Sequence, residues 1–533
     1  MGAPGAERGA GPAPSEHVPL AYLLLTAVVC GAMVMVLEIL GSRVIGPFFG
    51  VSLFVWTSLI TVTLISLAGG YAAGGALSDR GRAPGRLYAI IVAAGVLVLA
   101  VPLLKGAVLK ACLGLGLRTG ALTSALVLFG PALFLLGAVS PFLLRIAVRE
   151  MHSLGRTVGL FSALSTVGSF FGTVLTGFVL IAYFGVDRIF QVVGGLLIAL
   201  GVGYFLLAGR RWRTLPLLAL PLLLPLPDAS GVHLLPNGVE VTRVAASSGF
   251  YGQVRVFDYR ASGNHTREMT IDGLIQGGID VASGMSVYAY SYLLELIPRA
   301  INPAGRTCLV IGLGGGTIPM AYERQGVRTD VVDIDPNVVE TARSWFGFRN
   351  TGRMVLADAR SFLLSSRDRY DYIVLDVFTG DTTPAHLLSV EAMRLVRERL
   401  AGGGVFGINL VGALRGDTFI TASLVRTLRQ VFGTVEIHPL FDPSEGEGFG
   451  NMVIIAHDGP AVPLPPDLAT TRPVHPLAWP ELARFFGSTF DFPQGTAAIV
   501  LTDDYNPVDF YDLAIKEKVR GAIIAQTPLD LLL

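Results

Sequence analysis

Several features of common protein classes are scarce in this chain. Only three of its 533 residues are cysteine, and they lie far apart, which argues against a disulfide framework and favours a reducing compartment. Basic and acidic residues number 40 each, so the net charge is zero and nothing indicates a nucleic-acid partner. No cluster of histidine and cysteine has metal-ligand spacing, so we expect no bound metal. Charged residues make up only 15% of the chain, which directs attention to its apolar residues.

Apolar runs fill most of the first part of the chain, after a tail at 1–17 that is rich in Gly, Ala and Pro and is expected to be disordered. Each run is long enough to cross a hydrocarbon core of about 30 Å. The run TLPLLALPLLLPLP at 214–227 is interrupted by proline, and we interpret it as an interfacial or re-entrant segment. We expect six spans, near 19–42, 51–76, 87–109, 120–147, 157–184 and 186–207.

Basic loops follow the second, fourth and sixth runs, with the sequences SDRGRAPGR, RIAVREMHSLGR and GRRWR. These loops fall on one side of the membrane, and the positive-inside rule makes that side cytoplasmic. We therefore expect a multi-pass protein of the cell (inner) membrane, in contact with the lipid bilayer, whose second half lies in the cytoplasm. In the fifth run, Gly168 and Gly172 form a GxxxG pattern, which predicts close helix packing.

Beyond residue 232 the charge density becomes that of an ordinary globular protein. Alternating residues from Val239 to Gly273 predict a small antiparallel β-unit, and a helix is expected at about 287–300. The runs TCLVIGLGGGTIPM, RTDVVDID, MVLADA and YDYIVLDVF then indicate strands of a parallel sheet buried on both faces. Helices are expected at about 316–325, 336–346, 389–400 and 416–431, and further strands at GVFGINLV, TVEIHPLF and NMVIIAH.

These patterns predict a multi-span α-helical membrane domain followed by an α/β, Rossmann-like domain with a small N-terminal β-unit. The expected division has four parts: the tail at 1–17, a transmembrane domain of six or seven spans at 18–231, the β-rich unit at 232–300 and the Rossmann-like domain at 301–533.

The strand ends of the parallel sheet carry the residue types expected at a nucleoside site. Three runs end at Asp333, Asp358 and Asp376, and the carboxyl ends of parallel strands converge on the crevice where such sheets bind ligands. Asp333 suits a ribose hydroxyl, although the Asp335–Pro336 pair also makes a good helix start. Asp358 is a candidate for adenine binding or for a helix cap. The first run ends in glycines that let the backbone approach a ligand, namely Gly312, Gly314, Gly315 and Gly316.

The ordered segments GQVRVFD, IDGLIQ, VIGLGGG, VDIDP, DAR, YDYIVLD and PAHL resemble the polyamine aminopropyltransferases, the spermidine synthase family, from about Gly249 to Gly412. LEILGSRVIGPFFG, VWTSLI, GGALSDR, ALSTVGSFFGT and LTDDYNPVDFYDL resemble its membrane-fused branch. The resemblance implies transfer of an aminopropyl group from decarboxylated S-adenosylmethionine, a co-substrate, to putrescine or a related amine. Spermidine and methylthioadenosine would be the products. It also implies no permanently bound cofactor, and assembly as homodimers.

The resemblance also assigns roles to individual residues. Asp376 falls on the catalytic acid, which would position the amine and accept its proton. Tyr290 matches a tyrosine beside the amine channel. The nucleoside would contact Gln253 and Gln276, with Asp333 at the ribose, Asp358 and Ala359 at the adenine, and Pro384 lining the base pocket.

The amine half of the pattern departs from the family. Gly315 stands where the family carries an acid, and Ser291 replaces the usual histidine or glutamine after the tyrosine. Asp381 lies two residues beyond an expected acid, and Asp503 or Asp504 could also substitute. Two alternatives therefore stay open: a methyltransferase or a transferase for another amine, and a non-enzymatic polyamine sensor or transporter.

Overall fold

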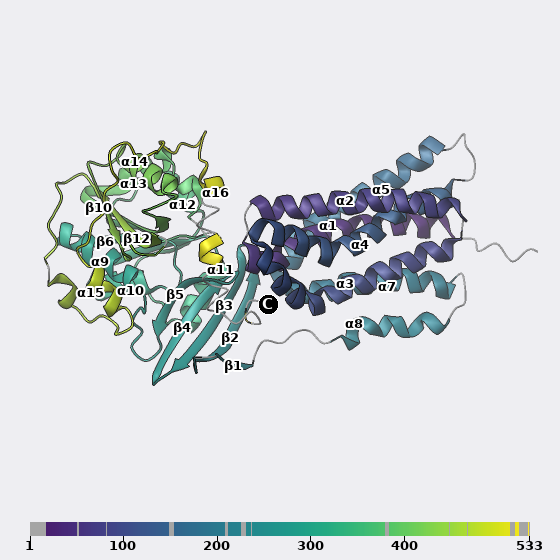
Figure 1. Ribbon diagram of the computed structural model, residues 1–533, viewed down its shortest axis with the longest axis horizontal. Coiled ribbons are helices and arrows are strands. Elements are labelled where there is room, and N and C mark those ends of the chain that lie inside the picture. Colours follow the sequence, from purple (N-terminus) through teal and green to yellow (C-terminus); the bar gives the residue numbers. More distant parts are fainter. Residues whose placement is uncertain are drawn as a thin grey trace, which may run out of the picture. The chain divides into compact units, whose positions relative to one another are not determined.

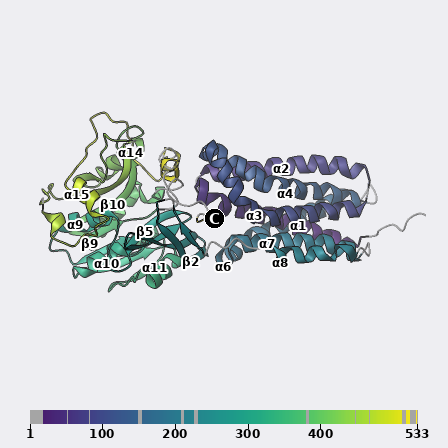
Figure 2. The ribbon, with the colours of Figure 1, turned by 60° about the horizontal axis from the view of Figure 1, so that its bottom comes forward.

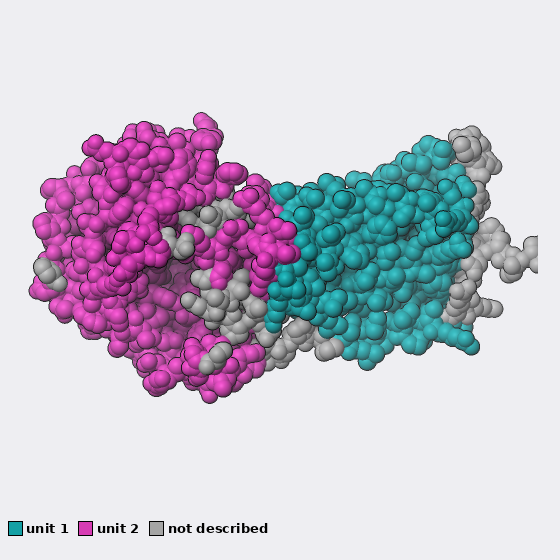
Figure 3. All heavy atoms as spheres, viewed as in Figure 1, with its two compact units in different colours: residues 1–44, 57–112, 121–227 teal, residues 45–56, 113–120, 228–533 magenta. Residues whose placement is uncertain are grey.

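The structure is a computed structural model that describes residues 18–50, 53–81, 83–148, 154–207, 212–224, 231–235, 237–378, 383–446, 448–465, 467–511, 517–521 and 531. The chain divides into two compact units (Figure 3). One unit comprises residues 1–44, 57–112 and 121–227, and the other comprises residues 45–56, 113–120 and 228–533.

Helices lie side by side in the first unit (Figures 1 and 2), and within the described ranges six helices are long and apolar enough to cross a membrane. These six stretches are Leu20–Phe49, Leu53–Asp79, Pro84–Leu115, Leu117–Ala147, Leu154–Tyr183 and Val186–Leu207. They agree with the six runs expected from the sequence. The elements are α1 (Leu20–Phe49), α2 (Leu53–Asp79), α3 (Pro84–Cys112), η1 (Leu113–Leu115), α4 (Leu117–Ala147), α5 (Leu154–Leu175), η3 (Thr176–Leu180), α6 (Ile181–Tyr183) and α7 (Val186–Leu207).

The proline-rich run forms two short helices, η4 (Trp212–Ala219) and α8 (Leu220–Leu223), rather than one regular helix. Proline lacks the amide that an interior helical position needs, which explains the interruption. Together they are shorter than the helices that could cross a membrane.

Close packing in the first unit depends on glycine, as the GxxxG pattern predicted. A Cβ atom on Gly168 of α5 would lie 2.1 Å from the carbonyl oxygen of Val28 on α1, and one on Gly172 would lie 2.6 Å from that of Ala32. The prediction of close helix packing is confirmed. One ion pair also joins two helices of this unit: Lys105 on α3 donates to Asp187 on α7 at 2.7 Å.

The second unit begins with five antiparallel strands in sequential order: β1 (Val232–Leu234), β2 (Glu240–Gly249), β3 (Gly252–Ala261), β4 (Asn264–Ile271) and β5 (Leu274–Asp280). The last strand extends beyond the segment expected from the sequence, because Gly277 and Gly278 interrupt the alternation there but continue to pair with β4. Helix α9 (Ala289–Ile301) follows, with Tyr288 as its N-cap.

A mixed seven-stranded sheet forms the rest of the unit, in the order β11-β12-β10-β9-β6-β7-β8. Only β12 runs opposite to the other six strands, and the order gives a Rossmann-like, methyltransferase-type fold. The chain order reverses between β6 and β9, which is the topological switch point where such sheets bind ligands. The strands are β6 (Thr307–Ile311), β7 (Arg328–Asp333), β8 (Met354–Leu356), β9 (Tyr370–Leu375), β10 (Leu400–Ala413), β11 (Thr434–Pro439) and β12 (Phe449–His457).

Helices cover both faces of this sheet (Figure 1) and enclose two apolar cores. Side chains of α9, α10 and α11 pack in one core, and those of α12, α13 and α14 pack in the other. Helix α12 was anticipated only through the helix-cap interpretation of Asp358, and its bounds were not predicted, because a seven-residue helix gives too few turns for a clear period. The helices are α10 (Thr317–Arg324), α11 (Pro336–Trp345), α12 (Ala359–Ser365), α13 (Val390–Arg399) and α14 (Phe419–Leu428), with the short helices η5 (Ala385–Leu387), η6 (Leu468–Thr470), α15 (Trp479–Phe485) and α16 (Val508–Tyr511).

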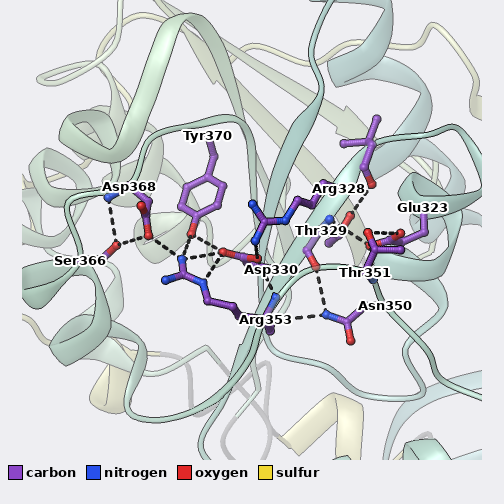
Figure 4. Close-up of polar contacts among 11 residues, drawn as sticks. Glu323, Arg328, Thr329, Asp330, Asn350, Thr351, Arg353, Ser366, Asp368 and Tyr370 are labelled. Atoms are coloured by element: carbon purple, nitrogen blue, oxygen red, sulfur yellow. Dashed lines mark hydrogen bonds and ion pairs between the residues drawn. The ribbon is translucent and has the colours of Figure 1, made fainter.

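A polar network connects β7, β8 and β9 away from the carboxyl ends of the strands (Figure 4). Buried Asp330 accepts hydrogen bonds from the Arg353 guanidinium at 2.6 Å and from the Tyr370 hydroxyl at 2.9 Å. Arg353 also pairs with Asp368 at 2.5 Å. Because a buried carboxylate is costly without such partners, we assign this network to stability.

Candidate active site

The glycine turn after β6 lies at the switch point, against two neighbouring backbones. A Cβ atom on Gly312 would lie 2.0 Å from the carbonyl oxygen of Asp376, and one on Gly314 would lie 2.3 Å from that of Gln276. Gly312, Gly314 and Gly316 also have positive φ, at 89°, 50° and 76°. These positions require glycine, because a side chain would clash with the neighbouring backbone and because the backbone has positive φ. The turn packs against β5 of the β-unit on one side and against the end of β9 on the other.

Asp333 ends β7 beside this turn and holds it in place. Its Oδ2 accepts from the amide of Leu313 at 2.8 Å, and its Oδ1 accepts from the amide of Asp335 at 2.8 Å. Burial raises the pKa of Asp333 to about 6, against the effect of these hydrogen bonds. Asp335, not Asp333, caps α11, since its side chain accepts from the amide of Asn337. The carboxylate thus accepts several backbone amides, with Ile334 a further donor, and together they fix its orientation beside the turn.

Asp358 ends the segment after β8 and caps α12, accepting from the Ser361 amide at 2.9 Å. The helix-cap interpretation of this residue is thus confirmed, and Ala359 is the first residue of the helix. The second carboxylate oxygen lies 3.2 Å from Nε2 of His386 in η5, which begins directly after Pro384. Partial burial acts to raise the pKa of Asp358, but the hydrogen bonds outweigh it and hold the pKa below its usual value.

Asp376 follows β9 directly, at the switch point of the sheet. Its Oδ1 accepts from the side-chain amide of Asn409 on β10 at 2.8 Å. Burial raises the pKa of Asp376 to about 6, and the hydrogen bond from Asn409 acts in the opposite direction. The carboxylate is therefore mostly ionised at neutral pH yet basic enough to accept a proton.

Tyr290 lies in the first turn of α9, and the negative charge of Asp376 acts on its hydroxyl group. Burial and then the Asp376 charge raise its pKa well above the usual value. Its ring stacks on that of Tyr288, with centroids 6.2 Å apart. The tyrosine thus lies near enough to the carboxylate for the Asp376 charge to act on its hydroxyl group.

The two predicted glutamines lie on β3 and β5. Oε1 of Gln253 accepts from the guanidinium of buried Arg255 at 2.6 Å, which leaves its amide hydrogens to donate. Gln276 contacts the glycine turn through its carbonyl, and its side-chain amide donates to Leu274 at 3.4 Å.

Several positions that were considered as sources of a negative charge for binding the amine do not supply one in the structure. A Cβ atom on Gly315 would lie 3.0 Å from the ring of Phe346, so this ring fills the space beside the glycine. Asp503 pairs with Arg360 on α12, which compensates its charge. Asp381 lies outside the described residues. In the part of the chain that the structure describes, no group of three His, Cys, Asp or Glu side chains could hold a metal ion.

Sequence reasoning missed two residues that orient the site. Asn409 is a lone amide inside the apolar run GVFGINLV, which is the signal that could have identified it. Arg255 gave no such signal, because alternation in a half-buried strand places many charged residues on the exposed face.

Comparison with known proteins shows that part of the chain is similar to one family. Residues 287–444 match the model of the spermine/spermidine synthase domain. The chain is 34% identical over 227 residues to an N-terminal histidine N-methyltransferase of Emericella nidulans, covering 39% of each protein. It is 33% identical over 174 residues to a polyamine aminopropyltransferase of Vibrio vulnificus, covering 31% of this chain and 54% of the relative.

Among solved structures, a probable spermidine synthase from Corynebacterium glutamicum matches with a TM-score of 0.39 and 20% identity, over 46% of this chain and 88% of that one. The chain thus spans about two fifths to a little over half of the curated relatives' length. Within the second unit, however, the matched domain contains α9, the glycine turn and all three carboxylates. The carboxyl-terminal half of this chain contains a spermine/spermidine synthase domain.

Proposed function

We propose that the second unit transfers an aminopropyl group from decarboxylated S-adenosylmethionine to an amine, with putrescine as the acceptor and spermidine and methylthioadenosine as products. The observation that carries the proposal is the position of Asp376. This partly buried carboxylate, with a pKa raised to about 6, lies at the switch point beside both Tyr290 and the glycine turn.

In the proposed donor complex, Asp333 binds the ribose, and Asp358 with the Ala359 amide binds the adenine. Gln253 and Gln276 contact the nucleoside from the β-unit, and Pro384 lines the base pocket. The sulfonium then lies over the glycine turn with its reactive methylene toward Asp376.

The reaction is a displacement at carbon. The amine lone pair forms a bond to the aminopropyl carbon while the bond from that carbon to sulfur breaks. The electron pair of the broken bond stays on sulfur, giving a neutral thioether. Asp376 accepts the proton that the nitrogen loses. Since the sulfonium is already a good leaving group, orientation of the two reactants supplies much of the acceleration.

Assaying methylthioadenosine release by the detergent-solubilised full chain tests the proposal. Wild-type protein should release it when given decarboxylated S-adenosylmethionine and putrescine. Asp376→Asn keeps the shape of the side chain and an acceptor for Asn409, and it should lower turnover by 10²-fold or more, as expected for loss of a general base. Full turnover in that variant would exclude Asp376 as the base.

Methyl transfer from intact S-adenosylmethionine is the second candidate, and Gly315 favours it. With no acid at this position, the carboxylate of the intact donor is not repelled by a like negative charge there. Several curated relatives are named methyltransferases. The two reactions leave different products, since methyl transfer releases S-adenosylhomocysteine and aminopropyl transfer releases methylthioadenosine.

We further propose that the first unit anchors this activity in the cell membrane with the second unit on the cytoplasmic side, as a homodimer. To test the orientation, single cysteines are placed in the loop after α2 and in the second unit. They should not react with a membrane-impermeant thiol reagent added to intact cells, and should react once the cells are permeabilised.

A further inference from the structure

Glu268, on β4, is a carboxylate that the proposed reaction does not yet use. Its Oε1 accepts a hydrogen bond from the Tyr288 hydroxyl at 2.5 Å, and Tyr259 on β3 also donates to it. Burial is the main cause that raises its pKa. The residue keeps some exposed surface, as do its neighbours along the first part of β4. The residue is therefore only partly buried.

No cation balances this carboxylate among the residues that the structure describes. Its hydrogen-bond partners are neutral phenols. The adjacent Arg267 lies on the other face of β4, where it pairs with Asp258 at 2.6 Å. A partly buried carboxylate without a counter-charge is costly, and such groups concentrate at binding sites.

Aromatic rings extend from Glu268 toward Asp376. The Tyr288 ring, bonded to Glu268, stacks on the Tyr290 ring with an interplanar angle of 29°. Tyr290 is in turn the residue whose pKa the Asp376 charge raises. Two carboxylates therefore flank a pair of tyrosine rings, and both carboxylates and aromatic faces attract alkylammonium groups.

The β5 strand places Glu268 close to the glycine turn. Gln276 touches this turn through its carbonyl oxygen, and Gly277 contacts it at Gly315. One residue further, a Cβ atom on Gly278 would lie 3.1 Å from the Glu268 side chain and 3.0 Å from the Tyr288 ring. Gly278 thus brings the Glu268 side chain and the Tyr288 ring together one residue along β5 from the contact with the turn, on the opposite face of the strand.

We propose that Glu268, with Tyr288 and Tyr259, binds the distal ammonium of a diamine acceptor whose other nitrogen reacts beside Asp376. This inference rests on the proposed amine transfer and assigns the residue that recognises the second amino group of the acceptor. It makes Glu268 a specificity residue rather than the base.

The test compares putrescine with n-butylamine, which has the same four-carbon chain but one nitrogen. Binding of each to the full chain is measured by calorimetry in wild type and in Glu268→Gln. This variant removes the charge but keeps the acceptor for Tyr288, so a purely structural Glu268 predicts no change. Glu340→Gln, on the exposed side of α11, removes a matched charge away from the site.

We expect Glu268→Gln to weaken putrescine binding at least tenfold and butylamine binding less than twofold, with Glu340→Gln like wild type. Equal effects on both amines, no effect on either, or a wild type that binds no putrescine would overturn the inference. Failure of the proposed function is separate, because it appears as absent methylthioadenosine release even where putrescine binds through Glu268.

Discussion

Burial raises the pKa of Asp376 and a hydrogen bond from Asn409 lowers it, so removing this donor should change the pH at which the enzyme works. Asn409 is buried on β10 and donates to Asp376 Oδ1 at 2.8 Å. In Asn409→Leu the ionised carboxylate loses this donor while the burial that raises its pKa remains. The ionised form becomes less favourable, so the pKa of Asp376 should rise further above about 6.

A hydrogen bond to a charged group contributes about 1.5–3 kcal/mol, and one pKa unit corresponds to about 1.4 kcal/mol. The acid limb of kcat/KM for the amine should therefore shift upward by about 1–2 pH units. If the limb starts near 6, activity at pH 7 falls about two- to tenfold and recovers near pH 9.

The assay is methylthioadenosine release from pH 5 to 9 with the full chain. Asn451→Leu is the matched control, because it removes an amide from the neighbouring strand β12, beside Val411 rather than Asp376. An acid limb that stays in place or moves to lower pH in Asn409→Leu would refute the assignment of that limb to Asp376. A shift of the same size in the control would do so as well.

Three further predictions concern the donor site, the core of the second unit and the first unit. Gly314→Ala should weaken binding of decarboxylated S-adenosylmethionine at least tenfold by calorimetry, because its Cβ would lie 2.3 Å from a carbonyl oxygen. Gly326→Ala, also at positive φ but in open space, should leave that affinity within twofold. Arg353→Leu should destabilise the second unit by about 2 kcal/mol at pH 7 in thermal unfolding of the full chain. Burial acts to raise the pKa of Asp330, but the hydrogen bonds from Arg353 and Tyr370 keep it below its usual value, so the stabilisation is present above about pH 4 and lost as pH falls through the folded-state pKa. A penalty that stays constant down to pH 2 would contradict this. Gly168→Ile should lower the thermal stability of the first unit by about 1–3 kcal/mol, whereas Gly159→Ile, with nothing within 4 Å of its Cβ, should not.

The elements that lie in order along the chain could be predicted from the sequence. The spans follow from the length of the apolar runs, and the central strands follow from runs whose residues are nearly all buried, as in β6 and β9. The glycine turn and Asp376 were predictable because each directly ends such a run. Their meeting at one crevice follows from the strand order, in which β6 and β9 are neighbours.

Features that depend on pairing between distant strands could not be predicted. Asn409 reaches Asp376 because β10 pairs with β9 in parallel, with Ile408 opposite Leu375. Glu268 meets Tyr288 because β4 pairs with β5 and Gly278 leaves space between them. Neither contact has a signature at a single position, because each depends on a register set by the rest of the sheet.

The central claim is that the second unit binds an adenosine-bearing sulfonium at the switch point, and that it binds the decarboxylated form more tightly than the intact form. Calorimetric titration of the full chain with decarboxylated and with intact S-adenosylmethionine tests it most directly. The account predicts tighter binding of the decarboxylated donor, weakened by Asp333→Asn. Binding of neither ligand, or tighter binding of the intact one, would contradict it.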